Sequence, residues 1–242
     1  MKSFEEKRFG FHSIQALLKN KPHKIKKIFL PEKRSDSRIE DLIKLIDENG
    51  INYELSKKIK QDPVAIMQKE ERLSFQALKN FVSKAKNNNL LILILDNIID
   101  PRNIGSCLRS AAVLEVDAVI INKHKCGPLN EVAHNVSAGG SDFLNIYHVS
   151  NLVNCIKFLK ENDIEIFGLS EHAEKIHTDT KFSNSSAIIM GSEQNGLRQK
   201  TIENCDYLLK LGNNKTFKSF NVSVATGIIL TEIVRQRNSE ND

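Results

Sequence analysis

The residues best suited to chemistry lie in three short polar stretches, each of which follows an apolar run of strand length. The first stretch covers residues 96–111 and holds an acid, an amide, a glycine and an arginine at close spacing: Asp100, Asn103, Gly105 and Arg109. Asp100 has the chemistry of a helix N-cap, and Pro101 suits the first helical position because it has no N–H to leave unpaired. Gly105 costs a helix about 1 kcal/mol relative to Ala, which indicates a close approach to the backbone there. A strand-to-helix edge of this kind is where an α/β sheet usually binds its ligand.

Asn103 and Arg109 are the two side chains of this stretch that could act on a ligand. They lie six residues apart, and an ideal helix does not place residues at that spacing on one face. The two side chains therefore converge only if Asn103 belongs to the turn and Arg109 points back toward it.

The second and third stretches have a similar form. Residues 188–197 begin as a buried strand that breaks at Gly191, followed by Glu193 and by Gly196, which opens a helix. Two glycines around one acid let backbone N–H groups reach a ligand, although a plain strand–turn–helix connection explains this stretch taken alone. Residues 209–225 end a strand, form a polar loop and enter an apolar helix. Three residues with capping chemistry crowd that entry: Ser219, Asn221 and Ser223. Any one of them could be merely a cap.

Several other kinds of site have no signature in this sequence. Neither G-x-G-x-x-G nor G-x-x-x-x-G-K-[ST] follows the first long apolar strand, which disfavours a dinucleotide-binding Rossmann domain and a P-loop NTPase. The seven histidines form no H-x-x-x-H or H-E-x-x-H set. The four cysteines are scattered without a CxxC pair: Cys107, Cys126, Cys155 and Cys205. We therefore expect no metal site and no disulfide framework, and cysteines that pack in a reduced, cytoplasmic setting.

From residue 90 onward, strand-length apolar runs alternate with helical patterns. The predicted strands cover residues 90–95, 118–122, 144–149, 164–169, 186–190 and 206–211. The predicted helices cover residues 101–115, 129–137, 150–161, 196–204 and 220–236. This alternation predicts an α/β fold with a mostly parallel sheet that is covered on both faces.

The chain before residue 76 predicts a smaller α/β unit. Its predicted helices cover residues 9–19 and 37–48, and its predicted strands cover residues 25–30 and 51–55. Residues 76–89 are polar, end Lys-Ala-Lys-Asn-Asn-Asn and have the composition of a linker that contains some helix. The sequence thus divides into a small domain at 1–75, a linker at 76–89 and a larger domain at 90–242.

The net charge of +5 is unevenly distributed along the chain. Residues 1–38 hold eleven Lys or Arg against four Asp or Glu, a balance of +7, and the remaining 24 basic and 26 acidic residues balance at −2. A local basic surface of this size suits a polyanion and favours RNA or DNA over the solvated face of an ordinary small domain. No apolar run approaches the length of a membrane span, so we expect no membrane partner.

Taken together, the three stretches resemble the three motifs of the SpoU (TrmH-type) branch of the SPOUT RNA methyltransferases. The matching residues are Leu95-Asp-x-x-x-Asp-Pro-x-Asn-x-Gly-x-x-x-Arg109-x-Ala111, Met190-Gly-Ser-Glu-x-x-Gly196 and Ser219-Phe-Asn-Val-Ser-Val-Ala225, running on to Thr231-Glu232. They occur in the family's order and spacing. Residues 10–18 are similar to the ribosomal-protein-like substrate-binding domain of the bacterial 23S rRNA guanosine 2′-O-methyltransferases, so the resemblance covers nearly the whole chain.

The resemblance implies the methylation of a guanosine ribose 2′-oxygen in large-subunit rRNA, with S-adenosylmethionine as cofactor and no metal. It implies a cytoplasmic homodimer, with no DNA or membrane partner, whose catalytic domain ends in a trefoil knot. The residues that it assigns to catalysis are Arg109, Asn103, Glu193, Ser219 and Asn221. The residues that it assigns to backbone contacts with the cofactor are Gly191, Leu211 and Phe220.

The chemistry of that reaction suits these side chains. A ribose 2′-OH attacks an already activated sulfonium methyl group in line, so alignment supplies much of the rate and no nucleophilic side chain is needed. Arginine is a poor general base because its guanidinium stays protonated. We therefore favour Arg109 as a clamp for an RNA phosphate and a stabiliser of the developing alkoxide, over a deprotonated Arg109 acting as the base. Glu193 suits the orientation of neighbouring groups better than proton abstraction.

One departure from the family pattern keeps other functions open. Motif three usually begins Ile-Pro-Met-x-Gly, whereas residues 211–215 read Leu-Gly-Asn-Asn-Lys, and the tyrosine usual before the motif's glutamate is Thr231. If the loop position needs a positive φ, Lys215 would be strained there, so we predict weaker cofactor affinity with the chemistry intact. Tight binding of S-adenosylmethionine by titration calorimetry, lost in Lys215→Gly, would contradict this. The alternatives are a non-catalytic RNA-binding or ribosome-assembly protein of the same fold and a tRNA 2′-O-methyltransferase.

Overall fold

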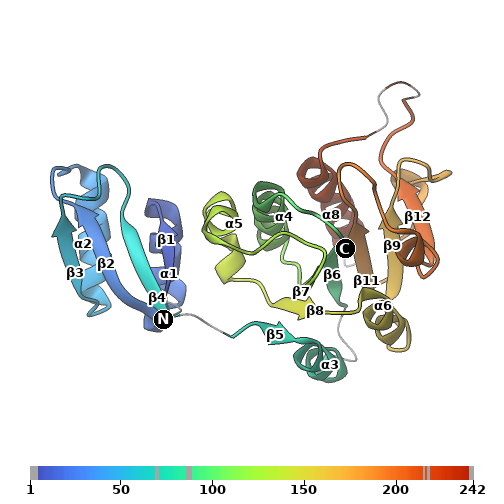
Figure 1. Cartoon of the computed structure of the whole chain (residues 1–242), viewed down its shortest axis with the longest axis horizontal. Coiled ribbons are helices and arrows are strands. Elements are labelled where there is room, and N and C mark those ends of the chain that lie inside the picture. The colour runs from blue at the N-terminus through green and yellow to red at the C-terminus, as the bar shows by residue number, and fades with distance from the viewer. Residues whose placement is uncertain (1–4, 69–70, 86–88, 215, 217–218, 240–242) are drawn as a thin grey trace.

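The computed structural model describes residues 5–68, 71–85, 89–214, 216 and 219–239, which form two α/β units side by side (Figure 1). The small unit (residues 5–68) contains one four-stranded sheet. Its strands in spatial order are β1 (Glu5–Phe9), β4 (Val64–Gln68), β2 (Ile25–Pro31) and β3 (Tyr53–Ser56). Only β2 and β3 pair in parallel, and the other neighbours are antiparallel.

Two helices bury their apolar faces on the small unit's sheet. They are α1 (Phe11–Asn20) and α2 (Ser37–Glu48), and a 3₁₀ turn, η1 (Pro22–Lys24), precedes β2. The Asp36 side chain caps α2 by accepting a hydrogen bond from the Ile39 N–H at 3.2 Å. The buried core that results combines helix and strand residues: Ile14, Leu17, Ile28, Leu30, Leu42 and Ile46.

The large unit (residues 71–239) is built on an eight-stranded sheet in which every neighbouring pair is parallel. The spatial order is β10 (Lys175–Ile176), β12 (Tyr207–Lys210), β9 (Glu165–Leu169), β11 (Ser186–Met190), β6 (Leu91–Leu95), β7 (Ala118–Asn122), β8 (Ile146–Val149) and β5 (Leu73–Ser74). Every residue of β6, β7 and β11 is buried. This explains their unbroken apolar sequences, because both faces of the sheet are covered.

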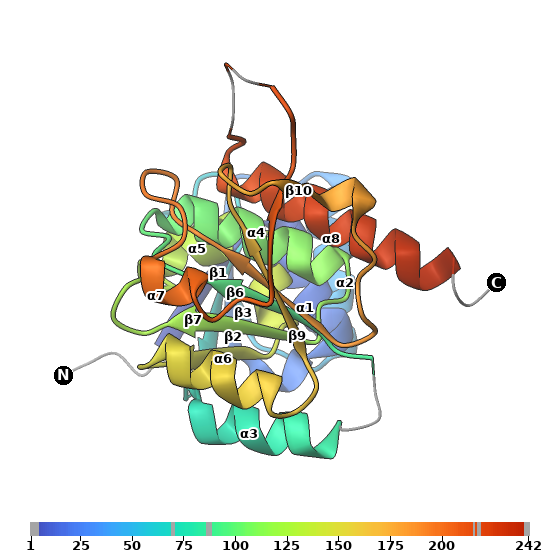
Figure 2. The same ribbon diagram turned by 90° about the vertical axis from the view of Figure 1, so that its right-hand side faces the viewer.

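Helices form a layer on each face of the large sheet (Figure 2). One layer contains α4 (Pro101–Val113), α5 (Glu131–Val136) and α8 (Val222–Ser239). The other contains α3 (Phe75–Lys84), α6 (Leu152–Lys160) and α7 (Gln199–Ile202). The 3₁₀ turns η2 (Gly140–Asp142) and η3 (His177–Asp179) complete the unit. The predicted α/β class, with a parallel sheet covered on both faces, is confirmed.

The sequence missed several elements and misplaced one. The short strands β1, β4, β5 and β10 had no prediction, and the predicted helix at 196–204 is wrong at its start. Residues 192–196 form a tight turn, and α7 begins only at Gln199. Helix α3 lies in the segment assigned to a linker, where its buried Leu78 and Val82 pack on the large sheet. The division at 1–75, 76–89 and 90–242 stays a prediction.

Candidate active site

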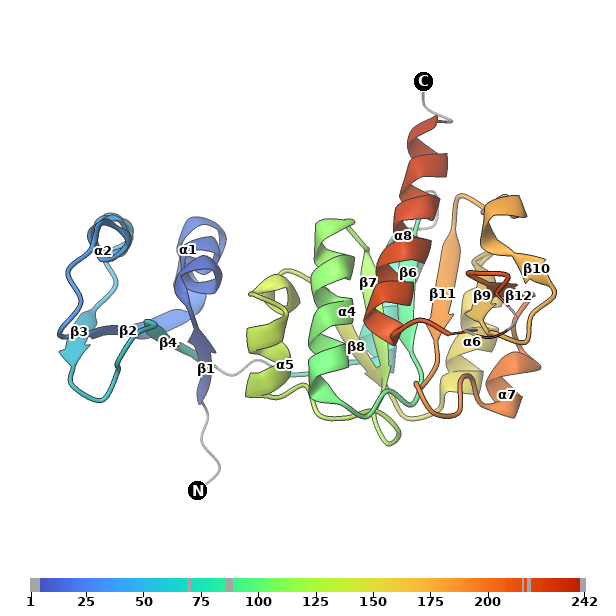
Figure 3. The same cartoon turned by 90° about the horizontal axis from the view of Figure 1, so that it is seen from above.

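The three polar stretches meet because the strands before them are parallel neighbours. Strands β6 and β11 pair directly, and β12 lies beyond β9 on the same side of β11. All four therefore end at one edge of the sheet, and the loops that leave them lie at that edge (Figure 3). This is the position at which open α/β sheets bind ligands.

Asn103 joins side chains from all three stretches. It lies in the first turn of α4, where its Nδ2 donates a hydrogen bond to Oε1 of Glu193. Its Oδ1 accepts a hydrogen bond from Nδ2 of Asn221 at 3.3 Å. Asn221 also caps α8, because its Oδ1 accepts hydrogen bonds from the Ser223 N–H at 2.9 Å and from the Ser223 hydroxyl at 2.6 Å. The amide of Asn103 is thus fixed at both ends.

The loop after β11 is a tight turn that requires glycine. Ser192 and Gly196 exchange two backbone hydrogen bonds, of 3.1 and 2.9 Å, and Gly196 has a φ of 61°. A Cβ on Gly191 would lie only 2.4 Å from the carbonyl carbon of Gly196. The crowded turn leaves Glu193 exposed at its tip, within reach of Asn103.

An ion pair between a buried carboxylate and a partly exposed arginine anchors the other end of this turn. Asp96 follows β6 and is 0% exposed. Its Oδ1 lies 2.6 Å from Nη2 of Arg198, and its Oδ2 accepts hydrogen bonds from Nε of Arg198 at 3.1 Å and from the Thr201 hydroxyl at 2.8 Å. Because a buried carboxylate needs such partners, Asp96 ties the segment after the turn to the end of β6.

The turn forms one wall of a cavity of about 270 Å³. Apolar side chains from the ends of β9 and β12 and from α8 form its floor: Leu169, Leu209, Leu211 and Ala225. Polar residues of the loop after β9 also line it: Ser170, Glu171 and His172. An apolar floor with a few polar groups is the usual composition of a small-molecule site.

Comparisons with known proteins agree with this architecture. The model of the SpoU rRNA Methylase family matches residues 90–231, which contain the parallel sheet from β6 to β12 and the cavity. The chain belongs to the SpoU rRNA methylase family. A second model, for RNA 2′-O ribose methyltransferase substrate binding, matches residues 9–62 in the small unit.

Two curated relatives match almost end to end. The 23S rRNA (guanosine-2′-O-)-methyltransferase RlmB of Escherichia coli strain K12 is 33% identical, over 95% of this chain and 98% of the relative. The RlmB protein of Pseudomonas putida strain KT2440 is 34% identical, over 96% of this chain and 97% of the relative. These two relatives span both units.

Solved structures share the fold at lower identity. The SpoU methyltransferase AviRb from Streptomyces viridochromogenes has a TM-score of 0.79 at 20% identity, over 98% of this chain and 91% of that one. An AdoMet-bound rRNA methyltransferase from Sinorhizobium meliloti has a TM-score of 0.75 at 18% identity, over 96% and 87%.

The structure brings together most of the residues that the SpoU motifs single out. All three candidate cofactor residues line the cavity, together with two candidate catalytic residues: Gly191, Leu211, Phe220, Glu193 and Ser219. Asn103 joins them through its hydrogen bond to Glu193, and Asn221 joins them through its hydrogen bond to Asn103.

Arg109 lies apart from this group. Asn103 is inside α4 and not in the preceding turn, so the condition for the two side chains to converge is not met. Arg109 is exposed, and no hydrogen bond or ion pair joins it to the rest of the described chain. The close approach expected at Gly105 comes from α5, because a Cβ there would lie 2.4 Å from the Ala133 carbonyl oxygen.

Sequence reasoning overlooked two parts of the site. One part is the loop after β9, which lines the cavity. It reaches the site because β9 lies beside β11 in the parallel sheet, and the sequence alone does not predict the order of the strands. Asp96 was interpreted only as the end of a strand, and its partner Arg198 lies 102 residues away. Lys215 lies outside the described residues, so the strain expected there stays a prediction.

The cysteines have the properties of packing residues. Burial raises the pKa of Cys107, Cys155 and Cys205 to about 12, and it also raises the pKa of Cys126. Thiols with such pKa values are poor nucleophiles near neutral pH. Within the described ranges, no group of three or more His, Cys, Asp or Glu is arranged to hold a metal ion.

Proposed function

We propose that this protein transfers a methyl group from S-adenosylmethionine to the ribose 2′-oxygen of a guanosine in large-subunit rRNA. The observation that carries the proposal is the hydrogen-bonded set Glu193–Asn103–Asn221 beside the cavity. It assembles one polar side chain from each of the three SpoU stretches where a ligand would bind. The RlmB relatives, which match both units, supply the substrate class.

The cavity fits the proposed cofactor. Leu169, Leu209 and Leu211 offer an apolar surface to a flat adenine ring, and the close packing at Gly191 brings backbone groups to the cavity wall. We expect Gly191, Leu211 and Phe220 to contact the cofactor through their backbone atoms. When bound, S-adenosylmethionine supplies a methyl group already activated on a sulfonium.

The chain's own residues then have the task of positioning the ribose. Asn103 holds Oε1 of Glu193, which leaves the other carboxylate oxygen to accept a hydrogen bond from a ribose hydroxyl. Asn221 holds Asn103 in place by donating a hydrogen bond to its Oδ1, and Ser219 lines the cavity at the entry to α8. Alignment of this kind contributes strongly to transfer from an activated donor.

Arg109 has a separate task in this scheme. Six residues along α4 separate it from Asn103 by about 9 Å of helix axis. Its exposed guanidinium is free to hold an RNA phosphate next to the reacting ribose and to favour negative charge there.

An RNA substrate also implies a cytoplasmic location. The described helices include none long and apolar enough to cross a membrane.

A homodimer is part of the proposal. Val113 on α4 is 74% exposed and Val224 on α8 is 50% exposed, although both are apolar. The two helices pack together where the Ser110 hydroxyl approaches Gly227, so small side chains lie between them. A second copy packed on α4 and α8 would bury both valines and bring Arg109 to the edge of the interface. Analytical ultracentrifugation of Val113→Glu, which should be monomeric, tests this. The knotted topology likewise stays an expectation of the family resemblance.

The test is transfer of labelled methyl groups to unmodified large-subunit rRNA. Wild type should label one ribose 2′-oxygen, and Arg109→Ala should lose most of the rate. Lys157→Ala is the control, because it removes an exposed cation from α6 on the opposite face of the sheet. Label on a base, or full activity in Arg109→Ala, would contradict the assignment. RNA binding without cofactor binding or transfer would favour the non-catalytic alternative.

A further inference from the structure

The small and large units meet through a buried ion pair. Arg8 of β1 is 5% exposed, and the side chain of its partner Asp142 in η2 is 9% exposed. The contact is bidentate: Nε of Arg8 lies 2.8 Å from Oδ2 of Asp142 and Nη2 lies 2.7 Å from Oδ1. Nη2 also donates to Glu6 at 3.1 Å. Paired geometry of this kind is directional as well as strong.

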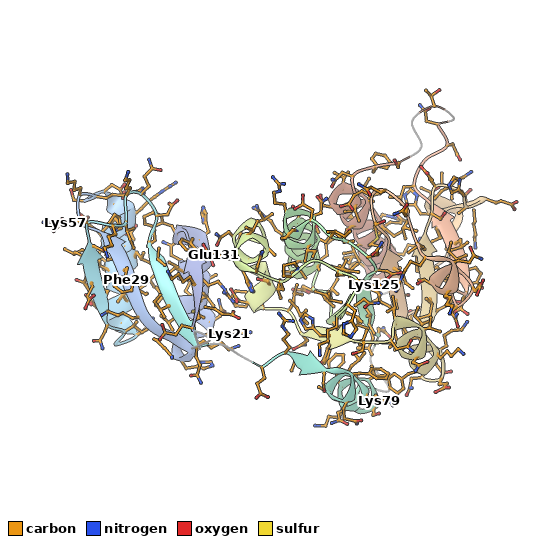
Figure 4. All side chains as sticks on the ribbon, in the orientation of Figure 1. Lys21, Phe29, Lys57, Lys79, Lys125 and Glu131 are labelled. Carbon is orange, nitrogen blue, oxygen red and sulfur yellow. The ribbon has the colours of Figure 1, made fainter. Side chains whose placement is uncertain are left out.

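Close packing surrounds this interdomain ion pair. Nζ of Lys21 donates a hydrogen bond to the backbone oxygen of Asp142 at 2.6 Å and lies over the ring of Phe143. A Cβ on Gly139 would lie 3.1 Å from Cα of Ser13, so the two backbones are in near contact. Figure 4 shows Lys21 and Glu131 on the facing sides of the two units. The small unit is therefore seated on α5 and η2 in one orientation.

Helix α5 and the turn η2, which contact the small unit, also pack on α4. A Cβ on Gly140 of η2 would lie 3.4 Å from Cα of Arg109, and α5 approaches Gly105 even more closely. Interiors at this packing density transmit displacement from one element to the next. The position of the small unit is thus fixed relative to α4, which carries Asn103 and Arg109.

A cleft of about 740 Å³ opens beside the ion pair, between the two units. Basic and imidazole side chains from both units line it, together with Glu6, Glu71 and the ion pair itself. They are Lys21, His23 and Lys24 from the small unit, and Arg72, His134 and His148 from the large unit. Burial is the main cause that lowers the pKa of His148 to about 4, and the nearby charges of Arg72 and Lys123 lower it further. The orientation of the two units in this structure brings both sets to the same cleft.

We propose that the Arg8–Asp142 ion pair holds the two units in this orientation so that the cleft binds the phosphate backbone of the RNA substrate across both. Arg8 and Asp142 are positioning residues: they touch neither the ribose nor the cofactor, and they determine where bound RNA enters the site. The inference rests on the proposed function for its RNA substrate. An exposed ion pair would contribute little to such an orientation, whereas a buried bidentate pair leaves an uncompensated charge when one partner is removed.

The experiment uses the full-length protein with Asp142→Asn, Arg8→Gln and the reversed pair Arg8→Asp/Asp142→Arg. Asp163→Asn is the matched control, because Asp163 is exposed on the turn after α6 and its φ of 59° suits Asn. Small-angle scattering should show a larger maximum dimension for both single variants. Their Kd and KM for 23S rRNA should rise about tenfold, with kcat at saturating RNA and the Kd for S-adenosylmethionine within about twofold of wild type. The reversed pair should recover part of both the dimension and the affinity.

Two results would overturn the inference. One is unchanged scattering and RNA affinity in Asp142→Asn. The other is a loss of RNA affinity in the single variants with no recovery in the reversed pair, which would assign the effect to damage within one unit. Scattering and RNA binding need no methyl transfer. A wild-type protein that transfers no methyl group would therefore refute the proposed function, while the variants would still decide the role of the ion pair.

Discussion

Asn103 has the most demanding position of any single residue in the site, because its amide must donate to Glu193 and accept from Asn221 at once. Asn103→Asp replaces the donor with a second carboxylate oxygen facing Glu193. We expect kcat for rRNA methylation to fall about 100-fold, the scale of loss for a misplaced reacting group. The Kd for S-adenosylmethionine should stay within about twofold.

The same substitution at Asn154, which is exposed on α6, controls for the added charge. Single-turnover kinetics with saturating cofactor would measure the step directly. A normal rate in Asn103→Asp would mean that the Glu193–Asn103–Asn221 set is only structural.

Asp96 is the second residue on which the site depends, although it lies behind the cavity and outside its lining. Asp96→Asn removes the charge that pairs with Arg198. Because Arg198 is partly exposed and can regain water, we expect a loss of about 3 kcal/mol in the free energy of unfolding, the lower end of the range for a broken buried pair. Affinity for S-adenosylmethionine should fall as the turn at 192–196 loosens. Urea unfolding and calorimetric titration, each compared with Asp163→Asn, would measure both effects, and unchanged values would contradict the anchoring role.

Among the elements, the turn after β11 restricts most strongly which residues it can contain. A methyl group at Gly191 would lie 2.4 Å from the carbonyl carbon of Gly196, so Gly191→Ala must displace the turn. Gly212→Ala is the control next to the cavity-lining residue Leu211, because a Cβ there would meet nothing closer than the Phe220 ring at 3.9 Å. We expect the Kd for S-adenosylmethionine to rise more than tenfold in Gly191→Ala and to change less than about twofold in Gly212→Ala. Equal affinities in the two variants would show that the cofactor does not depend on this turn.

The elements also show what local sequence can and cannot predict. Helix α2 was predicted because its apolar residues recur at helical spacing, and α4 because Asp100 also offered a cap. Strand β1, with four charged residues of five, carries no apolar alternation, and its pairing with β4 is a contact between distant parts of the chain. The loop after β9 belongs to the site only because β9 pairs with β11, a neighbour relation that local patterns do not encode.

The same limit applies to the candidate site. Motif residues predicted the cavity wall, since Gly191, Leu211 and Phe220 all line it. They left open whether Asn103 and Arg109 converge, because that depends on where the turn before α4 ends. The structure places Asn103 inside α4, and the two side chains stay apart. The Asp96–Arg198 and Arg8–Asp142 pairs join residues more than 100 positions apart, so they are properties of the folded chain.

At the scale of the whole molecule, the two units divide the labour between RNA capture and methyl transfer. The first 38 residues carry a balance of +7, whereas the cavity and its hydrogen-bonded set belong entirely to the large unit. Deletion of residues 1–70 removes the small unit and keeps both β5 and Ser74, whose side chain caps α3. We therefore expect the truncated protein to fold and to bind S-adenosylmethionine within about twofold of wild type, while rRNA methylation falls at least about 100-fold.

Salt dependence separates this explanation from a damaged catalytic site. Each phosphate contact that is lost reduces the slope of log affinity against log salt concentration, so the truncated protein should bind rRNA both more weakly and with a shallower slope. Raising the rRNA concentration should then restore part of the rate, because the deficit lies in capture and positioning. A truncated protein with wild-type activity on the same rRNA would refute the division of labour. A truncated protein that binds rRNA normally but transfers no methyl group would instead show that the small unit supports α4 through α5 and η2, whose contacts with Gly105 and Arg109 would then be the route of that support.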